Sequence, residues 1–366
     1  MKKSRIRKLC RIMRDENIDY VFLSPGSNFY YLTGIDLFAD ERFRVMIIDN
    51  NGKIVLVIPK LDKAEVEKSN FLDQKENSKA KYWSDTENPQ RILKSVISSQ
   101  SRKVAVEGKI EYKSFAKMKP LLKESEIILA DEVMNRLRVT KEEKEISYLK
   151  KAAEIADRVG ESIQDFIAAG VSEKELSHEI EYRLKSYGDG KLAFSPVVAA
   201  GPNSSSPHNL PGDYKIKTGD AITPDFGCLY NNYCSDISRT YFLEHVEQQK
   251  AEIYEIVREA QKRAIEKIQP GVEVEKVDLA ARNFIEDKGY GDYFLHRTGH
   301  GVGLDYHEEP YVKKGNKRKL EPGMVFSVEP GIYLPEKFGV RIEDIVVVRE
   351  NGAEVLNKLS KDLVVI

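Results

Sequence analysis

Two blocks in the C-terminal part of the chain repeat one order of elements, two helices followed by a pair of strands. Apolar residues at helical spacing indicate each helix, and short apolar runs indicate each strand. The blocks share no obvious sequence identity. Their repeated order predicts an α+β domain with pseudo-twofold symmetry, in which each strand pair contributes equivalent positions to one central site. The expected helices cover 141–168, 172–187, 246–268 and 275–289, and the strand pairs cover 220–242 and 323–349.

Capping patterns mark the start of this domain. Thr140-Lys-Glu-Glu143 has the sequence of a capping box, which predicts that a long helix begins there. Ser172 is followed at the third position by Glu175, which predicts the start of the second helix. We therefore expect the boundary near 136–140, with an N-terminal domain over 1–136 and a second domain over 137–366.

The N-terminal part alternates short apolar strands with helical patterns, which predicts an α/β domain with a mixed sheet. The first helix places Ile6, Leu9, Cys10 and Met13 on one face, so we expect that face to be buried. An Asn50-Asn-Gly52 turn predicts a hairpin. This domain has no glycine-rich phosphate loop, so nothing supports a nucleotide site. The expected strands are 20–24, 43–48, 53–59, 103–107 and 126–130.

The first strand pair of the C-terminal domain carries two aspartates, Asp225 and Asp236, eleven residues apart. A hairpin centred between Tyr230 and Asn231 would place them directly opposite each other, whereas a turn at Asn231-Asn232 alone would shift this register. Directly opposed carboxylates would lie about 5 Å apart at Cβ and repel each other. A cation between them would convert that repulsion into shared coordination.

The second strand pair carries Glu329 and Glu343, which are symmetric about Glu336 in a credible loop. Each glutamate interrupts an apolar run. Taken singly, an edge-strand charge facing water is the better explanation of either one. Four acidic residues at mirrored positions in two hairpins are better explained as metal ligands.

The segment from His296 to His307 holds three of the six histidines, among glycines that allow close backbone approach to a ligand. His208 lies in a loop whose composition suits a substrate-facing turn. His178 and His245 are interpreted as structural or solvated. Four carboxylates and one imidazole from the 296–307 segment suit Mn²⁺, Co²⁺, Zn²⁺ or Fe²⁺, and can neutralise two divalent ions. The residues alone therefore predict metal-assisted hydrolysis.

Charge and cysteine content limit the remaining classes of function. The 366 residues include 58 Lys and Arg against 59 Asp and Glu, a formal net charge of -1, so no nucleic-acid or membrane partner is expected. Cys10, Cys228 and Cys234 are an odd number without a signal peptide, which indicates a reducing compartment. No apolar run is long enough to span a bilayer. We therefore expect a soluble cytoplasmic protein.

Taken together, the motifs resemble those of the pita-bread metallopeptidases. Within that family the chain looks most like the Xaa-Pro dipeptidases (prolidases) and the closely related aminopeptidases P. The segment from Asn17 to Gly34 resembles the creatinase-type N-terminal domain of these enzymes, so the resemblance covers nearly the whole chain. The motifs are Asp225-Phe-Gly, Tyr233-Cys-Ser-Asp236, the segment from Gly299 to His307, Val328-Glu-Pro-Gly331 and Val340-Arg-Ile-Glu-Asp344.

The resemblance implies a site with two divalent ions, Mn²⁺ or Co²⁺ before Zn²⁺ or Fe²⁺, and attack on the Xaa-Pro bond by a hydroxide shared between them. Asp225 would bind one ion and His300 the other. Glu329 would bind alongside His300 and relay a proton to the leaving nitrogen, and Asp236 and Glu343 would bridge both ions.

The resemblance also assigns residues to the substrate. His307 would stabilise the tetrahedral intermediate or hold the scissile carbonyl, and His208 and His296 would line the substrate site. Arg341 either supports the bridging carboxylates or binds the carboxylate on the product side. Small proline-containing peptides are the implied substrates, and a homodimer is the implied assembly.

Several alternatives stay open. An aminopeptidase P would act on longer Xaa-Pro peptides with the same metal site, and the sequence favours a dipeptidase only slightly. A metal-free creatinase-like hydrolase or a non-catalytic binding module would have lost metal ligands, and none is lost here. Pro224 stands where an apolar strand residue is usual, which indicates an edge or bulge. The basic loop 313–318 could meet a substrate carboxylate, although a solvated charge run explains it better.

Overall fold

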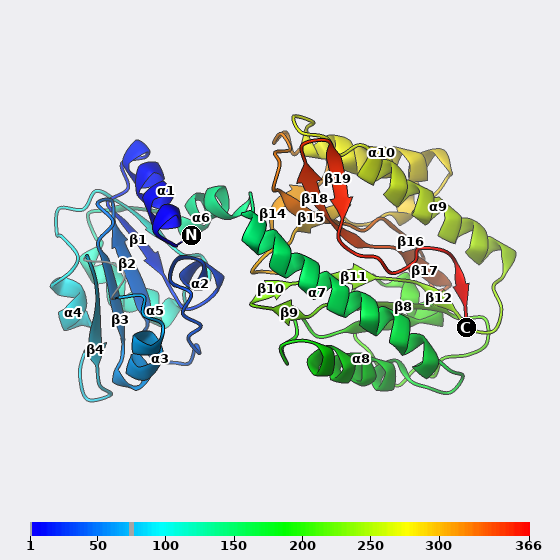
Figure 1. Ribbon diagram of the computed structural model, residues 1–366, viewed down its shortest axis with the longest axis horizontal. Helices are drawn as coiled ribbons and strands as arrows, with labels where there is room; N and C mark the ends of the chain where they lie inside the picture. Colours follow the sequence, from blue (N-terminus) through cyan, green and yellow to red (C-terminus); the bar gives the residue numbers. More distant parts are fainter. Residues whose placement is uncertain (1, 73–76) are drawn as a thin grey trace. The chain divides into compact units, whose positions relative to one another are not determined.

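The computed structural model describes residues 2–72 and 77–366 and divides into two compact units, Met1–Arg138 and Val139–Ile366 (Figure 1). No helix in these described ranges is long and apolar enough to cross a membrane. Cys10, Cys228 and Cys234 are buried, and none of them forms a disulfide within the described ranges.

The first unit is built on a six-stranded sheet with the order β4-β3-β2-β1-β5-β6. β1, β5 and β6 are mutually parallel, as are β3 and β4, whereas β2 is antiparallel to both of its neighbours, so the predicted mixed sheet is confirmed. Its strands are β1 (Tyr20–Leu23), β2 (Val45–Asp49), β3 (Ile54–Pro59), β4 (Ser78–Trp83), β5 (Lys103–Val106) and β6 (Glu126–Leu129). Its helices are α1 (Lys2–Asp15), α2 (Ser27–Thr33), η1 (Lys60–Asp62), α3 (Lys63–Lys68), α4 (Gln90–Lys94), α5 (Tyr112–Met118), η2 (Lys119–Leu121) and α6 (Ala130–Arg138).

Two features of this sheet test the sequence patterns directly. The pairing of Ile48 with Ile54 closes the predicted hairpin around residues 50–52. Strand β4 was not predicted, because its sequence Ser-Lys-Ala-Lys-Tyr-Trp is mostly polar and it lies at the sheet edge, where only one neighbour is needed.

Both faces of the sheet are covered by apolar contacts. Alternate strand residues, such as Phe22 and Val45, pack with residues of α4 and α5 in one hydrophobic cluster. The predicted apolar face of α1 is buried, which confirms the amphipathic pattern. The residues of that face are Ile6, Leu9, Cys10 and Met13.

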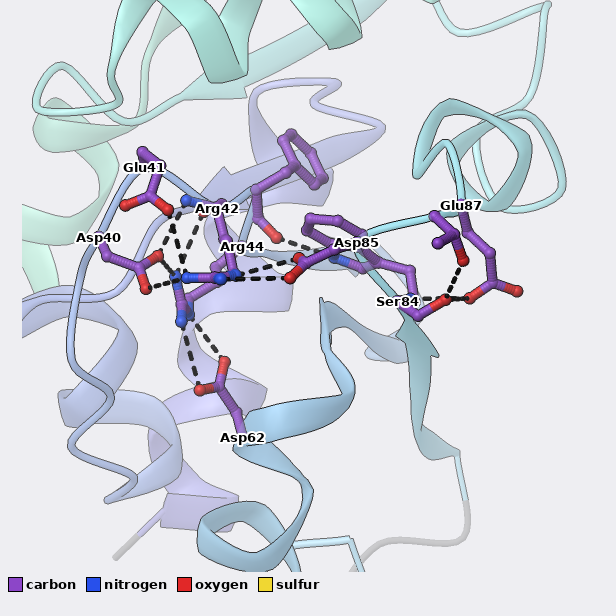
Figure 2. A network of polar contacts seen from close by, with 11 residues as sticks. Asp40, Glu41, Arg42, Arg44, Asp62, Ser84, Asp85 and Glu87 are labelled. Carbon is purple, nitrogen blue, oxygen red and sulfur yellow. Dashed lines mark hydrogen bonds and ion pairs between the residues drawn. The ribbon is translucent and has the colours of Figure 1, made fainter.

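A network of ion pairs holds the segment that leads into β2. Figure 2 shows the buried Arg44 guanidinium between the carboxylates of Asp40 and Asp62, with Arg44 Nε 2.7 Å from Asp62 Oδ2. Arg42, which is more exposed, pairs with Asp40 and with Asp85. Because Arg44 joins residues 40 and 62 across the start of the strand, this buried pair fixes the loop more firmly than the outer one does.

The second unit consists of two halves, each a helix pair beside a sheet, so the predicted pseudo-twofold α+β arrangement is confirmed (Figure 1). The first half contains α7 (Glu143–Ser162), η3 (Ile163–Phe166), α8 (Glu173–Tyr187), β7 (Val197–Ala200), η4 (Gly201–Ser205), β8 (Ala221–Phe226), β9 (Leu229–Tyr230), β10 (Tyr233–Cys234), β11 (Ile237–Ser238) and β12 (Tyr241–Phe242). The second half contains α9 (Gln248–Glu266), α10 (Val274–Asp287), η5 (Gly291–Tyr293), β13 (Gly299–Gly301), β14 (Glu308–Val312), β15 (Val325–Val328), β16 (Gly331–Leu334), β17 (Phe338–Arg341), β18 (Asp344–Arg349), β19 (Gly352–Val355) and β20 (Val364–Val365).

Each helix pair packs against the sheet of its own half, and α7 also packs against β15 and β18 of the other half. Residues of α7 and α8 form one cluster with β7, β8 and β11. Residues of α9 and α10 form another with β15 to β18. The two five-stranded sheets have the orders β11-β8-β12-β20, with β7 also on β8, and β14-β13-β15-β18-β19. β20 follows the second half in the sequence but pairs with β12 in the sheet of the first half.

The sequence predicted one of the two helix starts in the first half correctly and the other incorrectly. The predicted start at Thr140 is wrong. The capping box is formed by Glu142 and Glu145, and Thr140 instead makes an isolated β-bridge with Met324. The predicted capping box of the second helix is confirmed, since Ser172 Oγ accepts a hydrogen bond from Glu175 N at 3.2 Å.

The register of the first carboxylate hairpin differs from the predicted one. Tyr233 pairs with Tyr230 and Ser238 pairs with Asp225, so the turn is Asn231-Asn232 and Asp236 does not lie opposite Asp225. Both turn residues have positive φ, 49° and 64°, as a two-residue hairpin turn requires. Since Asp236 precedes the partner of Asp225 by two residues, the two aspartates are diagonal neighbours on one face.

The register of the second hairpin is the predicted one. Val328 pairs with Asp344 and Gly331 with Arg341, and the same register places Glu329 opposite Glu343. The centre of symmetry is Glu336, which has a φ of 60° in the turn.

Of the two alternatives expected at Pro224, an edge or a bulge, the edge is wrong. β8 is flanked by β7 on one side and by β11 and β12 on the other. Residues 239 and 240 lie between β11 and β12 and belong to neither strand. In the register that both strands share on β8, they lie opposite Pro224 and Thr223. The missing donor of Pro224 therefore coincides with a break in the ladder.

Arg239, in that gap, is the largest fully buried side chain of the described residues and joins both halves of the unit. Its guanidinium donates to the carbonyls of Ser238 and Glu343 at 3.0 and 2.6 Å, and pairs with Asp344 at 2.7 Å. It also donates to the carbonyls of Leu359 and Ser360. One buried cation thus fixes β11, β18 and the C-terminal segment together.

Candidate metal centre

A cavity of about 600 Å³ lies within the second unit. It is lined by all nine residues that the sequence predicted for the site, although they come from four separate stretches of the chain. These residues are His208, Asp225, Asp236, His296, His300, His307, Glu329, Arg341 and Glu343.

Three of the predicted metal ligands meet most closely. Asp236, His300 and Glu343 each offer one ligand atom, and these atoms lie within 4.8 Å of one another. Asp236 follows the end of β10, His300 lies in the middle of β13, and Glu343 directly precedes β18. Glu329 stands beside this group, with Oε1 3.2 Å from His300 Nε2, while Asp236 Oδ2 is 3.7 Å from the same nitrogen.

Asp225 lies on the same cavity wall and has a different partner. Its Oδ2 accepts a hydrogen bond from Arg341 Nη2 at 2.8 Å. Its Oδ1 is buried and has no hydrogen-bond partner among the described residues. A buried carboxylate oxygen left without a donor is costly, and a cation at this position would satisfy it. This oxygen and the three converging ligand atoms fit a divalent metal centre.

The electrostatics of the cavity require positive charge. Burial, reinforced by neighbouring carboxylates, raises the pKa of Asp236 and of Glu343 well above the usual range. Burial also raises the pKa of Asp225, against the opposing charge of Arg341. Acids that repel one another in this way are stabilised in their ionised form when a divalent cation lies between them.

Glu329 behaves differently from the other three acids. Burial raises its pKa, but the hydrogen bond with His300, the charges of His300 and His296, and the charge of Arg341 outweigh burial and lower the pKa to about 2. Glu329 is therefore the one of the four acids whose ionised form is favoured by its protein neighbours.

Arg341 occupies the centre of a buried network that the sequence did not reveal. Besides Asp225, it donates from Nε to Ser238 Oγ at 2.9 Å and from Nη1 to the Tyr333 hydroxyl at 3.1 Å. Ser238 Oγ in turn donates to Glu343 Oε2 at 2.8 Å. Arg341 thus holds Asp225 directly and Glu343 through Ser238.

Tyr333 fits this position because two glycines leave room for it. A Cβ atom on Gly331 would lie 2.5 Å from the Tyr333 hydroxyl, and one on Gly339 would lie 2.7 Å from its ring. The sequence contained one signal for this residue, a tyrosine in β16 with glycine two residues before it and a glycine as its partner in β17. Ser238 carried no such signal.

The other three histidines of the cavity, apart from His300, lie in different environments. His296 is hydrogen-bonded through Nε2 to the Tyr333 hydroxyl at 2.9 Å, and burial lowers its pKa. The His307 ring lies 4.0 Å from the His300 ring. Burial, together with the charges of His300 and Arg297, lowers the pKa of His307 to about 4. His208 is exposed on the cavity wall.

The fold and the cavity define a hydrolase of the carboxylate-rich metal type, and comparisons with known proteins name the family. Residues 147–350 match the model of metallopeptidase family M24, and residues 5–140 match that of the Creatinase/Prolidase N-terminal domain. The chain belongs to metallopeptidase family M24 and carries the creatinase-type N-terminal domain found with it.

Relatives agree with the family models over nearly the full length. The chain is 37% identical to the Xaa-Pro dipeptidase of Pyrococcus furiosus over 99% of each protein. The crystal structure of a prolidase from Thermococcus sibiricus superposes with a TM-score of 0.94 at 38% identity, covering 100% of this chain and 99% of that one. An X-Pro aminopeptidase from Thermotoga maritima gives a TM-score of 0.82 at 31% identity, covering 97% and 100%.

Proposed function

We propose that this metallopeptidase hydrolyses the Xaa-Pro peptide bond and acts mainly on dipeptides. The observation that carries the proposal is the convergence of Asp236, His300 and Glu343, with Asp225 and Glu329 beside them, in one cavity large enough for a dipeptide. The similarity to a Xaa-Pro dipeptidase and a prolidase supports proline as the residue after the scissile bond.

The five acidic and imidazole residues would hold two divalent ions, of which we expect Mn²⁺ or Co²⁺. Bound there, the ions would supply an activated water and polarise the scissile carbonyl. Asp236 and Glu343, from different halves of the unit, would contact both ions. Asp225 would use its unpartnered Oδ1, because its other oxygen is held by Arg341.

Glu329 is the residue that would move the proton. Its Oε1 lies 3.2 Å from His300 Nε2 on the cavity wall, where it would accept a proton from the attacking water and pass it to the leaving proline nitrogen. Ser327 Oγ donates to the same Oε1 at 3.2 Å and fixes its direction.

The histidines would orient the substrate. His307, adjacent to His300 and largely neutral at pH 7, would donate a hydrogen bond to the scissile carbonyl oxygen as negative charge develops there. His208 and His296 would line the remainder of the substrate site, where His296 is held by Tyr333.

The test begins with protein stripped by a chelator. We expect it to lose hydrolysis of Xaa-Pro dipeptides and to regain it with Mn²⁺ or Co²⁺. Asp236→Asn should lose bound metal and turnover together, while Asp213→Asn, a control at a side chain that is 92% exposed, should keep both. Full activity after chelation would refute the proposal.

The second candidate function is that of an aminopeptidase P, which the similarity to an X-Pro aminopeptidase keeps in view. A higher kcat/KM for Xaa-Pro-Yaa than for Xaa-Pro would transfer the assignment to it. We also propose that the protein is cytoplasmic, because three buried cysteines without a disulfide fit a reducing compartment. A further proposal is that it forms a homodimer. Light scattering on the eluting protein tests the dimer.

A further inference from the structure

A buried ion pair lies beside the cavity, outside the set of residues assigned to the site. Lys141 Nζ is 2.7 Å from Glu308 Oε1, and the two side chains are 1% and 6% exposed. Neither residue lines the cavity. Desolvation of two buried charges is so costly that such a pair adds little stability compared with apolar residues of similar size. A contribution to stability alone therefore does not explain the pair.

The cation of the pair is held in place by the backbone on either side of it. Lys141 N donates to the carbonyl of Gly323 at 2.8 Å, at the turn before β15. Lys141 Nζ also donates to the carbonyl of Val139 at 3.4 Å. Because β15 pairs with β13, the strand of His300, the segment that carries Lys141 is attached to the sheet that carries the site.

The carboxylate of the pair lies against the loop that carries His307. Glu308 directly follows His307 and pairs with Gly301 at the start of β14, so the sheet fixes its backbone. Its side chain turns back onto Gly303, where an added Cβ would lie 2.6 Å from Oε1. Asp305 N donates to Oε2 over 3.5 Å. The loop over residues 303–307 therefore folds around this carboxylate.

His307 is the residue of this loop that would act on the substrate. Its ring lies 4.0 Å from that of His300 and 4.7 Å from that of Tyr306, and all three residues line the cavity. A donor to the scissile carbonyl acts only within a narrow range of positions, and a displacement of about 1 Å can cost roughly 100-fold in rate. The loop therefore needs a rigid anchor, which the paired carboxylate supplies.

We propose that Glu308, held by Lys141, is a positioning residue for His307. The ion pair fixes the 303–307 loop and thereby sets the His307 imidazole at the scissile carbonyl. This inference rests on the proposed peptidase function and deepens it, since it gives a role in the reaction to two buried side chains that would not touch the substrate.

The experiment removes the pair without leaving a buried charge. Lys141→Met or Glu308→Met alone leaves one charge uncompensated and should lower the urea midpoint. The double variant Lys141→Met/Glu308→Met should recover most of the wild-type midpoint. Its kcat for a Xaa-Pro dipeptide should still be roughly 10- to 100-fold below wild type, with KM and bound metal unchanged. If this variant does not fold, Lys141→Met/Glu308→Gln, which keeps the shape of the carboxylate, gives the same comparison.

His307→Ala separates a positioning role from a general structural one. It should lower kcat by roughly 100-fold, as the loss of one oxyanion donor does. If the pair acts through His307, adding the double variant to His307→Ala should lower kcat further by less than about 3-fold. The matched control is Glu179→Met/Arg183→Met, which removes an ion pair of the same unit, 2.7 Å long and away from the cavity lining. It should keep the wild-type kcat.

Failure of the inference can be separated from failure of the proposed function. A double variant that recovers both the urea midpoint and kcat, or that causes its full loss again on top of His307→Ala, would overturn the positioning role alone. An equal loss of kcat in Glu179→Met/Arg183→Met would overturn it as well. An unchanged kcat in His307→Ala would overturn the role of His307 and the inference with it. Absence of Xaa-Pro hydrolysis by the metal-loaded wild type would overturn the proposed function instead.

Discussion

Ser238→Ala removes one hydroxyl that joins two charged groups beneath the site. Ser238 is fully buried, accepts a hydrogen bond from Arg341 Nε at 2.9 Å and donates one to Glu343 Oε2 at 2.8 Å. An alanine methyl group occupies nearly the same space, so the change tests the hydrogen bonds and not the packing.

The expected loss follows from those two contacts. A hydrogen bond with a charged partner contributes about 1.5–3 kcal/mol. We take about 1.5 kcal/mol for the bond to Arg341, which keeps Asp225 and Tyr333, and about 1 kcal/mol for the bond to Glu343, whose raised pKa favours its neutral form in the metal-free protein. We therefore expect the free energy of unfolding of the metal-free protein to fall by about 2–3 kcal/mol. Since Glu343 then lacks the group that directs it, metal affinity should also fall, by roughly 10- to 100-fold.

The assay is urea denaturation in the presence of a chelator, followed by far-ultraviolet circular dichroism, together with a metal titration. Ser177→Ala is the matched control, because Ser177 is buried in the same unit and donates only to the neutral carbonyl of Pro196 at 2.9 Å. That variant should lose about 1 kcal/mol and no metal affinity. Equal losses in the two variants, or unchanged metal affinity in Ser238→Ala, would refute the reasoning.

Two further predictions concern stability away from the cavity. Arg44→Met leaves Asp40 and Asp62 without their buried partner and should destabilise the first unit by about 3–5 kcal/mol. Arg42→Met, at the exposed pair, should cost about 1 kcal/mol or less. The fluorescence of Trp83, the only tryptophan, reports on the unfolding of this unit, and equal destabilisation in both variants would contradict the argument. Glu175, with a pKa lowered to about 2 by its capping-box serine and a lysine, contributes stability that is present above about pH 4.5 and lost as the pH falls towards 2. Glu175→Gln should therefore lower the urea midpoint at pH 7 and have a shrinking effect at pH 3, and an effect that is the same at both pH values would count against this origin.

The sequence was sufficient for the elements whose pattern is local. The helix pairs of the second unit, the hairpin around residues 50–52 and the symmetry of Glu329 and Glu343 about Glu336 all depend on periodicity or turn length. The nine residues expected at the site also share one cavity, because four strand ends and loops converge there.

The error in the first hairpin has a specific physical cause. We assumed that carboxylates sharing a cation must lie directly opposite each other, and this favoured a turn centred next to Tyr230. The left-handed conformation of Asn231 and Asn232 determines the register instead. A shift by two residues keeps Asp225 and Asp236 on one face, so the local turn and the shared site are compatible.

What the sequence could not provide are contacts between distant segments. Neither Ser238 nor Tyr333 has a pattern that connects it with Arg341, and the partner of Asp225 is known only once β8 and β17 are placed together. The hydrogen bonds of Arg341 are contacts of this kind, and they support the proposal that it holds the acidic residues in place. β4 was missed because an edge strand can be polar on both sides.

The buried Arg239 has a consequence for the order of events during synthesis. Its charge is met by Asp344, and its remaining donors by the carbonyls of Leu359 and Ser360, all more than a hundred residues later in the chain. While those segments are still inside the ribosome, Arg239, next to β11, has no acidic partner, and Asp236 lacks Glu343 beside it. The N-terminal unit can fold as it emerges. The hydrolytic site, by contrast, closes only when the end of the second unit has emerged, because Glu343 and these partners of Arg239 are all made late.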